Sequence, residues 1–258
     1  MYFIILAAGV GSRLKNLTKD KPKTLIEFKK KSLLDYQLSV IKRFGFLDIF
    51  LITGFKKKMF DKYTTYIKEK FHNSEYKKTN MVYSLYKAKS LFDGTNDIII
   101  SYGDIIYEES ILKKLISDKS KISVVIDLNW KKLWSLRMED PKKDIESLKL
   151  NSKGFITDIG QKVKSLKNLD GQFIGLIKIN KKFTKKFFDI FEKQKLDKRI
   201  FMTDYLQILI NNKILPSSVK IKNGWIEFDT LSDIQKYCEA YRNGKLDSII
   251  NIKELQKL

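Results

Sequence analysis

Short apolar runs alternate with amphipathic segments over roughly the first half of the chain. Unbroken apolar runs predict buried strands over Tyr2–Ala7, Asp48–Thr53, Asp97–Tyr102 and Ile122–Leu128. Apolar residues at helical spacing predict helices between them, over Leu33–Phe44, Met81–Phe92 and Ile111–Ile116. This alternation predicts a Rossmann-like α/β fold, with a mixed, mostly parallel sheet flanked by helices.

The pattern changes at Asn129. We interpret the charged segment 129–170 as a small excursion inserted on the substrate side, with short strands near Leu148–Leu150 and Phe155–Ile159. Beyond it we expect a strand over Gln172–Ile179 and helices over Lys181–Lys193, Thr203–Asn212 and Leu231–Tyr241. Short strands over Val219–Ile221 and Trp225–Phe228 are expected to flank an Asn223-Gly224 hairpin turn. No linker or repeat is evident, so residues 1–258 are expected to form a single domain.

The composition of the chain excludes several classes of protein. Hydrophobic residues make up 43% of the 258 residues and aromatic residues 12%, which excludes a disordered chain. The single cysteine, Cys238, excludes an internal disulfide and a cysteine-built zinc site. Because His72 is the single histidine of the chain, catalysis that depends on histidine is disfavoured.

The charge balance is strongly basic, since 51 basic minus 30 acidic residues gives +21. Polyanions, phosphates and acidic lipids are therefore plausible partners, and a nucleic-acid-binding protein is a rival interpretation. Such a protein would bind random DNA with a steep dependence on salt. The lysines are scattered along the whole chain, however, which favours a solvated basic surface and no nucleic-acid partner.

Nothing in the sequence predicts membrane insertion. No run of about 18 apolar residues occurs. The start of the chain lacks a basic segment and leads directly into a glycine motif, unlike a signal peptide. Together with the lone cysteine, this leads us to expect a cytoplasmic protein. The basic and apolar tail from Lys245 could serve packing or homo-oligomer formation.

A glycine-containing loop follows the first predicted strand, in the run Leu6-Ala7-Ala8-Gly9-Val10-Gly11-Ser12-Arg13-Leu14. Small residues let backbone amides approach phosphate oxygens closely, and Arg13 adds a planar cation suited to phosphate. The run is neither a dinucleotide fingerprint nor a P-loop. Taken alone, it is also compatible with an ordinary strand-to-loop turn.

A second motif, Lys21-Pro22-Lys23-Thr24-Leu25, follows soon after the loop. Together the two motifs resemble the signature of the nucleotidyltransferases that join a nucleoside triphosphate to a sugar phosphate or a small phosphorylated alcohol or amine. Later stretches are similar to the cytidylyltransferase branch and occur in its order: Asn80–Leu85, Tyr102-Gly103-Asp104 and Ile226–Thr230. The resemblance reaches from the N-terminus to near Ile234 and implies the same α/β fold.

The resemblance implies roles for the matching residues. CTP would bind at Leu6, Ala7, Ala8, Gly9, Gly11, Ser12, Asn80, Ser84, Tyr102 and Gly103. Arg13 would contact the departing β- and γ-phosphates, and Lys23 would bridge the α-phosphate and the incoming phosphate. Asp104 and Asp229 would bind Mg²⁺. Such a transfer needs charge neutralisation rather than a general base, which suits a chain with one histidine.

The physical chemistry of the two aspartates agrees with this role. Magnesium favours one or two carboxylates together with phosphate oxygens and waters. Asp104 and Asp229 each follow a predicted strand, and we expect them to converge from opposite halves of the sheet. The alternative is that each is only a turn-forming aspartate. Glu227 shares the strand face of Asp229 and could support the metal.

The sequence indicates the second substrate less clearly than it indicates the nucleotide. Trp134 could form part of a cage for a cation and Arg137 could bind a carboxylate or phosphate, or both could pack the excursion onto the sheet. Other candidate substrate ligands are Glu139, Lys149 and Gln172, although Lys149 and Gln172 could instead have solvated or structural roles. The excursion and the stretch Gly171–Leu176 are similar to a subgroup that activates phosphorylated glutamine for capsule decoration, giving CDP-L-glutamine. Phosphocholine, 2-aminoethylphosphonate and sugar 1-phosphates are the alternatives.

Two further enzyme-like interpretations are disfavoured. A glycosyltransferase usually carries a D-x-D metal motif after a strand, whereas Tyr102–Ile106 contains a single aspartate. A catalytically inactive homologue would be expected to lack one of the four principal charged residues, yet all are present: Arg13, Lys23, Asp104 and Asp229.

Overall fold

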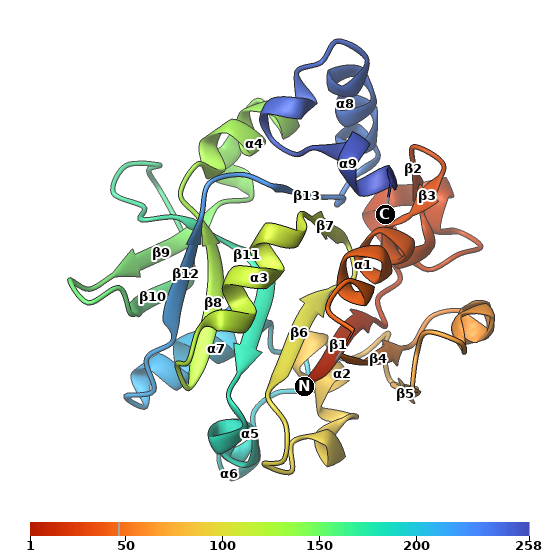
Figure 1. The fold of residues 1–258 in the computed structure, drawn as a ribbon. Helices are drawn as coiled ribbons and strands as arrows, with labels where there is room; N and C mark the ends of the chain where they lie inside the picture. The colour runs from red at the N-terminus through yellow and green to blue at the C-terminus, as the bar shows by residue number, and fades with distance from the viewer. Residues whose placement is uncertain (46, 258) are drawn as a thin grey trace.

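A seven-stranded mixed sheet forms the centre of the molecule, in the order β12-β8-β11-β6-β1-β4-β5 (Figure 1). The computed structural model describes residues 1–45 and 47–257; Phe46 and Leu258, the last residue of the predicted tail, lie outside the described residues. Most neighbouring strands are parallel, but β11 runs antiparallel to both of its neighbours. The strands are β1 (Tyr2–Ala7), β4 (Asp48–Thr53), β5 (Glu69–His72), β6 (Ile98–Tyr102), β8 (Ile122–Asp127), β11 (Gln172–Ile179) and β12 (Ser217–Ile221). The fold class predicted from the sequence is confirmed.

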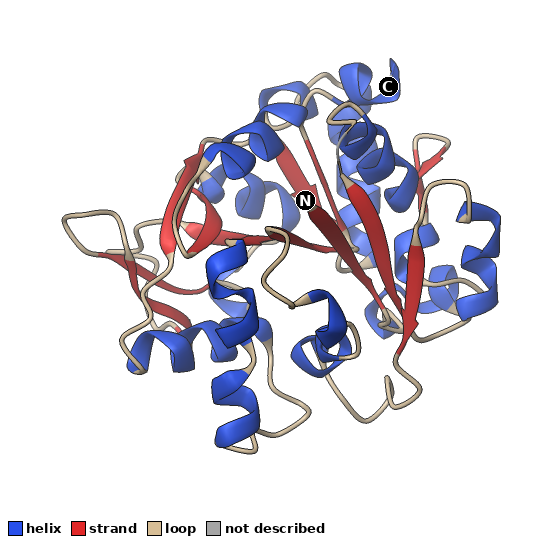
Figure 2. Ribbon diagram, turned by 60° about the horizontal axis from the view of Figure 1, so that its bottom comes forward, coloured by secondary structure: helices blue, strands red, loops and turns tan. Residues whose placement is uncertain are grey.

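Helices cover both faces of this sheet, as Figure 2 shows. One apolar core packs against α1 (Leu33–Lys42), α3 (Glu109–Ser117), α4 (Trp130–Arg137), α8 (Leu231–Arg242) and α9 (Ile252–Lys257). The other packs against α2 (Met81–Tyr86), α5 (Lys181–Phe187), α6 (Asp189–Lys193) and α7 (Met202–Asn211). Among the described residues, none of these helices is both long and apolar enough to cross a bilayer.

Several predicted helices differ in detail. The one predicted over Met81–Phe92 ends at Tyr86 and continues as the 3-10 turn η4 (Lys89–Leu91), and the one over Lys181–Lys193 is split near Phe188. The other 3-10 helices are η1 (Ser12–Thr18), η2 (Lys23–Leu25), η3 (Lys57–Tyr63), η5 (Pro141–Lys143) and η6 (Leu246–Ser248). The short strands β2 (Glu27–Phe28) and β3 (Lys31–Ser32) pair with each other beside the C-terminal tail (Figure 1).

The excursion contains more structure than the sequence pattern predicted. The two expected short strands are present as β9 (Glu146–Leu150) and β10 (Ile156–Lys162), and they pair antiparallel with each other. The helix α4 was not predicted, although Trp130, Leu133 and Trp134 are buried on it. Two tryptophans within a charged stretch obscured the helical period in the sequence.

The prediction of a hairpin at Asn223-Gly224 is wrong. Both residues do have positive φ angles, of 62° and 86°, but the flanking strands do not pair with each other. Strand β12 lies parallel to β8, and β13 (Trp225–Glu227) lies antiparallel to β7 (Ile105–Tyr107). The fully buried Asp127 explains the change of direction, because its carboxylate accepts hydrogen bonds from the Asn223 amide at 3.0 Å and the Trp225 indole at 3.0 Å.

The pairing of β13 with β7 decides where the two aspartates lie. Asp104 occupies the turn between β6 and β7, and Asp229 follows β13. The Phe228 amide donates to the Asp104 carbonyl at 2.9 Å, so the two chain segments are direct neighbours. The two aspartates do converge, but the expectation that they do so from opposite halves of the main sheet is wrong, because β7 and β13 form a separate two-stranded sheet.

We expect Asp127→Ala to lower the free energy of unfolding by about 3 kcal/mol, because it leaves the amides of Asn129 and Asn223 and the indole of Trp225 without their buried acceptor. Asp127→Asn should cost less, since its amide oxygen can still accept. Urea unfolding of the two variants measures the difference. Wild-type midpoints for both would contradict this role of Asp127.

Candidate functional site

A cleft of about 150 Å³ opens where β1 and β6 end. The predicted nucleotide ligands that line it are Leu6, Ala7, Ala8, Gly9, Asn80, Ser84, Tyr102 and Gly103, together with Lys23 and Asp104. Thr24, Tyr76, Thr79 and Met81 also line it and were not predicted as ligands. Thr24 and Met81 lie inside motifs that the sequence analysis had singled out, whereas Tyr76 and Thr79 precede a short helix in a polar stretch without a recognisable pattern.

Gly11 and Ser12 are not among the lining residues. Gly11 has a φ of 69°, and a side chain there would bring a Cβ atom within 2.9 Å of the Lys23 Cβ. Glycine at this position therefore allows the segment with Lys23 to pack against the loop. Ser12 begins η1, which carries Arg13 away from the loop.

Gln37 of α1 holds the turn that contains Asp104 through hydrogen bonds. The buried Gln37 amide donates to the carbonyls of Tyr102 and Ile105, each at 2.8 Å, and accepts from Ser101 at 3.0 Å. Gly103 lets the turn approach β1, since an added Cβ would lie 2.4 Å from the Leu6 carbonyl oxygen. The position of Asp104 thus follows from a helix residue that sequence analysis did not connect with the site.

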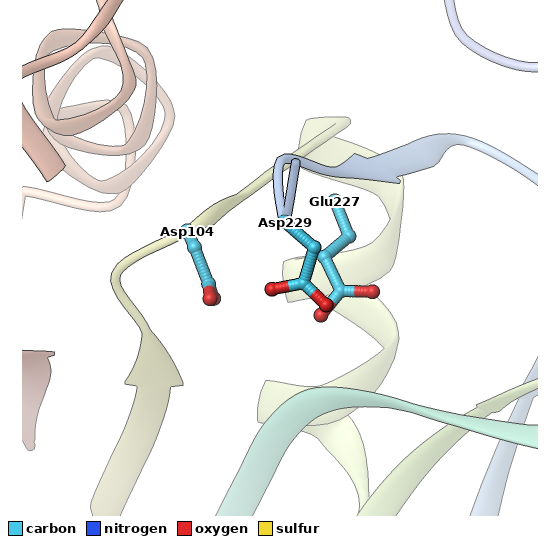
Figure 3. A group of neighbouring side chains, drawn as sticks. All are labelled: Asp104, Glu227 and Asp229. Carbon is cyan, nitrogen blue, oxygen red and sulfur yellow. The ribbon is translucent and has the colours of Figure 1, made fainter. Parts of the chain in front are cut away.

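Three carboxylates converge at this point. Asp104, Glu227 and Asp229 each offer an oxygen within 4.8 Å of the others, and Figure 3 shows the side chains extending from the two neighbouring segments. The Oδ1 atom of Asp104 is buried and has no hydrogen-bond partner among the described residues. Carboxylate oxygens so arranged could hold a hard divalent cation.

Basic side chains contact this carboxylate group directly. The Lys23 ammonium lies 2.6 Å from Asp104 Oδ2 and 2.7 Å from Asp229 Oδ1, and Arg13 lies 3.1 Å from the same Asp229 oxygen. Burial favours the neutral form of Lys23, but Asp104 and Asp229 outweigh it and raise its pKa. Burial likewise opposes ionisation of Asp229, but Lys23 and Arg13 prevail and lower its pKa.

Arg137 lies behind the carboxylates, and its side chain is 0% exposed. Its guanidinium is 2.8 Å from Glu227, 3.3 Å from Asp233 and 3.4 Å from Asp144. A second guanidinium nitrogen is 3.6 Å from Asp229. Arg137 is therefore committed to protein carboxylates, in contrast to the expectation that it binds substrate. The closest of them, Glu227, still has a pKa raised to about 8 by burial and by Asp229.

A second cleft, of about 220 Å³, adjoins the first, and Met81, Tyr102 and Asp104 line both. Of the remaining sequence candidates, Trp134, Gln172, Glu227, Arg13 and Asp229 line this second cleft. Glu139 is exposed on the surface and does not line either cleft. Lys149 is also absent from both linings, and its ammonium donates to the Asn168 carbonyl.

Comparison with known proteins agrees with this geometry. Residues 2–135 match the model of the family described as nucleotidyl transferase. This chain belongs to that family.

Two curated relatives and one solved structure illustrate the similarity. A Campylobacter jejuni protein named CTP:phosphoglutamine cytidylyltransferase is 36% identical over 93% of this chain and 100% of its own length. A choline-phosphate cytidylyltransferase from Streptococcus pneumoniae is 42% identical over 34% of this chain and 39% of its own. The structure of a CTP:phosphocholine cytidylyltransferase from Streptococcus pneumoniae superposes with a TM-score of 0.69 at 20% identity, over 93% of this chain and 98% of that one. At that identity the superposition shows a shared fold.

We expect Arg137→Met to lower the free energy of unfolding by about 3–5 kcal/mol at pH 7, because it leaves buried carboxylates without their counter-charge. Arg137 lowers the folded-state pKa of Glu227, which is about 8, so this pKa rises further without it. Glu227 then ionises at pH 9 in wild type but less in the variant, and the loss of stability should therefore be larger at pH 9 than at pH 7.

Urea unfolding at both pH values measures this difference. Arg199→Met is the matched control, since Arg199 pairs with Asp197 on the surface and should contribute little. An equal loss at pH 7 and pH 9 for Arg137→Met would contradict the counter-charge role.

Proposed function

We propose that this nucleotidyltransferase transfers CMP from CTP to a small phosphorylated amine or amino acid and releases pyrophosphate. L-glutamine phosphate is the best candidate acceptor, and its product would be CDP-L-glutamine, used to decorate a capsule or surface polysaccharide. The observation that carries this proposal is the similarity, across the whole length of both chains, to the Campylobacter protein named for that reaction.

The arrangement of the two clefts supports a transfer between two bound substrates. The first cleft, with the small-residue loop at the end of β1, suits the nucleotide. The second suits the acceptor, because it adjoins the first at Asp104 and also reaches Asp229. A phosphate from each side would then meet at the carboxylate group.

The reaction would be an in-line displacement at the α-phosphorus of CTP. An oxygen of the acceptor phosphate forms the new bond to phosphorus as the bond to the β-phosphate oxygen breaks, and pyrophosphate leaves with that electron pair. Lys23 would neutralise the two phosphates that meet, and Arg13 would bind the departing pyrophosphate. No residue needs to remove a proton, because a phosphate ester already carries negative charge at neutral pH.

We also propose that the enzyme depends on Mg²⁺. Asp104 and Asp229 would hold the ion, with Glu227 beside them, and the unpartnered Asp104 Oδ1 supports this assignment. When bound, such an ion supplies positive charge to phosphate oxygens. The chain's own contribution is to place the carboxylates and to keep Lys23 charged between them.

Phosphocholine is the second candidate acceptor. It is favoured by the identity of 42% between part of this chain and a choline-phosphate cytidylyltransferase. That match covers only 34% of this chain, whereas the phosphoglutamine relative matches 93%. 2-Aminoethylphosphonate and sugar 1-phosphates follow.

A pyrophosphate-release screen tests the proposal directly. It crosses the four common nucleoside triphosphates with L-glutamine phosphate, phosphocholine, 2-aminoethylphosphonate and glucose 1-phosphate. We expect the highest kcat/KM for CTP with L-glutamine phosphate. Preference for another nucleotide would contradict cytidylyl transfer, and preference for glucose 1-phosphate would contradict an amine-bearing acceptor.

We expect Lys23→Ala to lower kcat by about 10²–10³, because a preorganised charge at the reacting phosphates is lost. The affinity for CTP should fall much less, since other cleft residues still bind the nucleotide. Steady-state kinetics and CTP titration measure the two effects, with the exposed Lys19→Ala as control. Unchanged turnover would remove Lys23 from the mechanism.

Asp104→Asn and Asp229→Asn should each raise the Mg²⁺ concentration needed for half-maximal activity, because an amide oxygen is a weaker ligand than a carboxylate. Activity is measured over a magnesium titration at saturating CTP. If both variants retain wild-type activity at ordinary magnesium, the metal assignment is overturned.

A further inference from the structure

The second cleft contains one carboxylate whose charge the protein does not balance. Asp144 and Glu227 line this cleft, and Arg137 neutralises both. Glu146, at the start of β9, lines it too, yet no lysine, arginine or histidine forms an ion pair with it in residues 1–45 and 47–257.

The surroundings of Glu146 make this charge costly. Burial is the main cause that raises its pKa, and the nearby carboxylates of Asp204 and Asp144 add to it. A hydrogen bond from Thr203, which also lines the cleft, opposes the shift. The side chain therefore faces like charges and one hydroxyl, and a bound cation would relieve both repulsion and desolvation.

The backbone of Glu146 is held in place from the neighbouring strand. Gln172 of β11 donates to the Glu146 carbonyl at 2.7 Å and accepts from the Glu146 amide at 3.4 Å. The predicted substrate ligand Gln172 thus has its amide engaged with the backbone and acts as a positioning residue for Glu146. These contacts fix the position on β9 from which the Glu146 side chain reaches the second cleft.

The other walls of the second cleft suit an organic cation. Aromatic side chains line it on several sides: Tyr102, Trp134, Phe173, Phe201 and Trp225. Aromatic faces attract cations and pack well against aliphatic carbons. Asp104 and Asp229, where the acceptor phosphate would react, belong to the same cleft.

We propose that Glu146 binds the ammonium group of the acceptor and so selects phosphorylated amines and amino acids over neutral phosphate esters. This inference rests on the proposed function, since it assigns the acceptor to the second cleft. It names Glu146, rather than the surface residue Glu139, as the acidic group that recognises the substrate.

The test compares Glu146→Gln with wild type on a matched pair of acceptors, L-glutamine phosphate and its N-acetyl derivative, in which the amine is neutral. Glu146→Gln should lower kcat/KM for the amine-bearing acceptor by at least tenfold, because a charge-assisted hydrogen bond is lost. It should change kcat/KM for the acetylated acceptor by less than about twofold and leave the KM for CTP unchanged. Glu69→Gln, on the exposed side of β5, is the control.

Each outcome bears on a different claim. Equal effects of Glu146→Gln on the two acceptors, or no effect on either, overturn the ammonium site while leaving cytidylyl transfer intact. If phosphocholine is the better acceptor, the same comparison is made with its neutral analogue 3,3-dimethylbutyl phosphate, and the same selective loss is expected. Absence of pyrophosphate release by wild type with every acceptor overturns the proposed function and this inference together.

Discussion

The Lys23 ammonium, bound between Asp104 and Asp229, is the interaction on which the site depends. It joins residues that are 81 and 206 positions away from Lys23 in the sequence. Three features place these groups: Gly11 makes room for Lys23, Gln37 holds the turn of Asp104, and the pairing of β13 with β7 places Asp229 beside that turn. The fold thereby brings opposite charges together at the junction of two clefts.

Charge compensation explains why so many acidic groups can lie together in this site. Asp104, Glu227 and Asp229 would repel one another strongly if ionised without counter-charges. Arg137 balances them from the protein interior, and Lys23 and Arg13 balance them from the clefts. Only the groups on the cleft side remain available to anionic substrates. This division assigns a structural role to Arg137 and is consistent with the proposal that Lys23 and Arg13 bind phosphates.

Much of the fold could be predicted from the sequence, because buried strands and the glycine loop are local signals. The bounds of β1, β4 and β11 agree with their apolar runs, and the loop residues Leu6 to Gly9 do line a cleft. Contacts between residues far apart in the sequence could not be predicted from it. Asp127 directs the chain away from the predicted hairpin through contacts nearly a hundred residues away. Arg137 could be taken for a substrate ligand because its partners Glu227 and Asp233 lie 90 and 96 residues away in the sequence. No sequence motif near Glu146 indicates that this residue lines a cleft.

The most direct test of the central claim is anomalous diffraction at the manganese edge, from crystals grown with Mn²⁺ and a CTP analogue that cannot be cleaved between the α- and β-phosphates. Our account predicts an ion bound by carboxylate oxygens of both Asp104 and Asp229, in contact with the analogue's phosphates and beside Lys23. An ion bound to the nucleotide with neither aspartate among its ligands would contradict it.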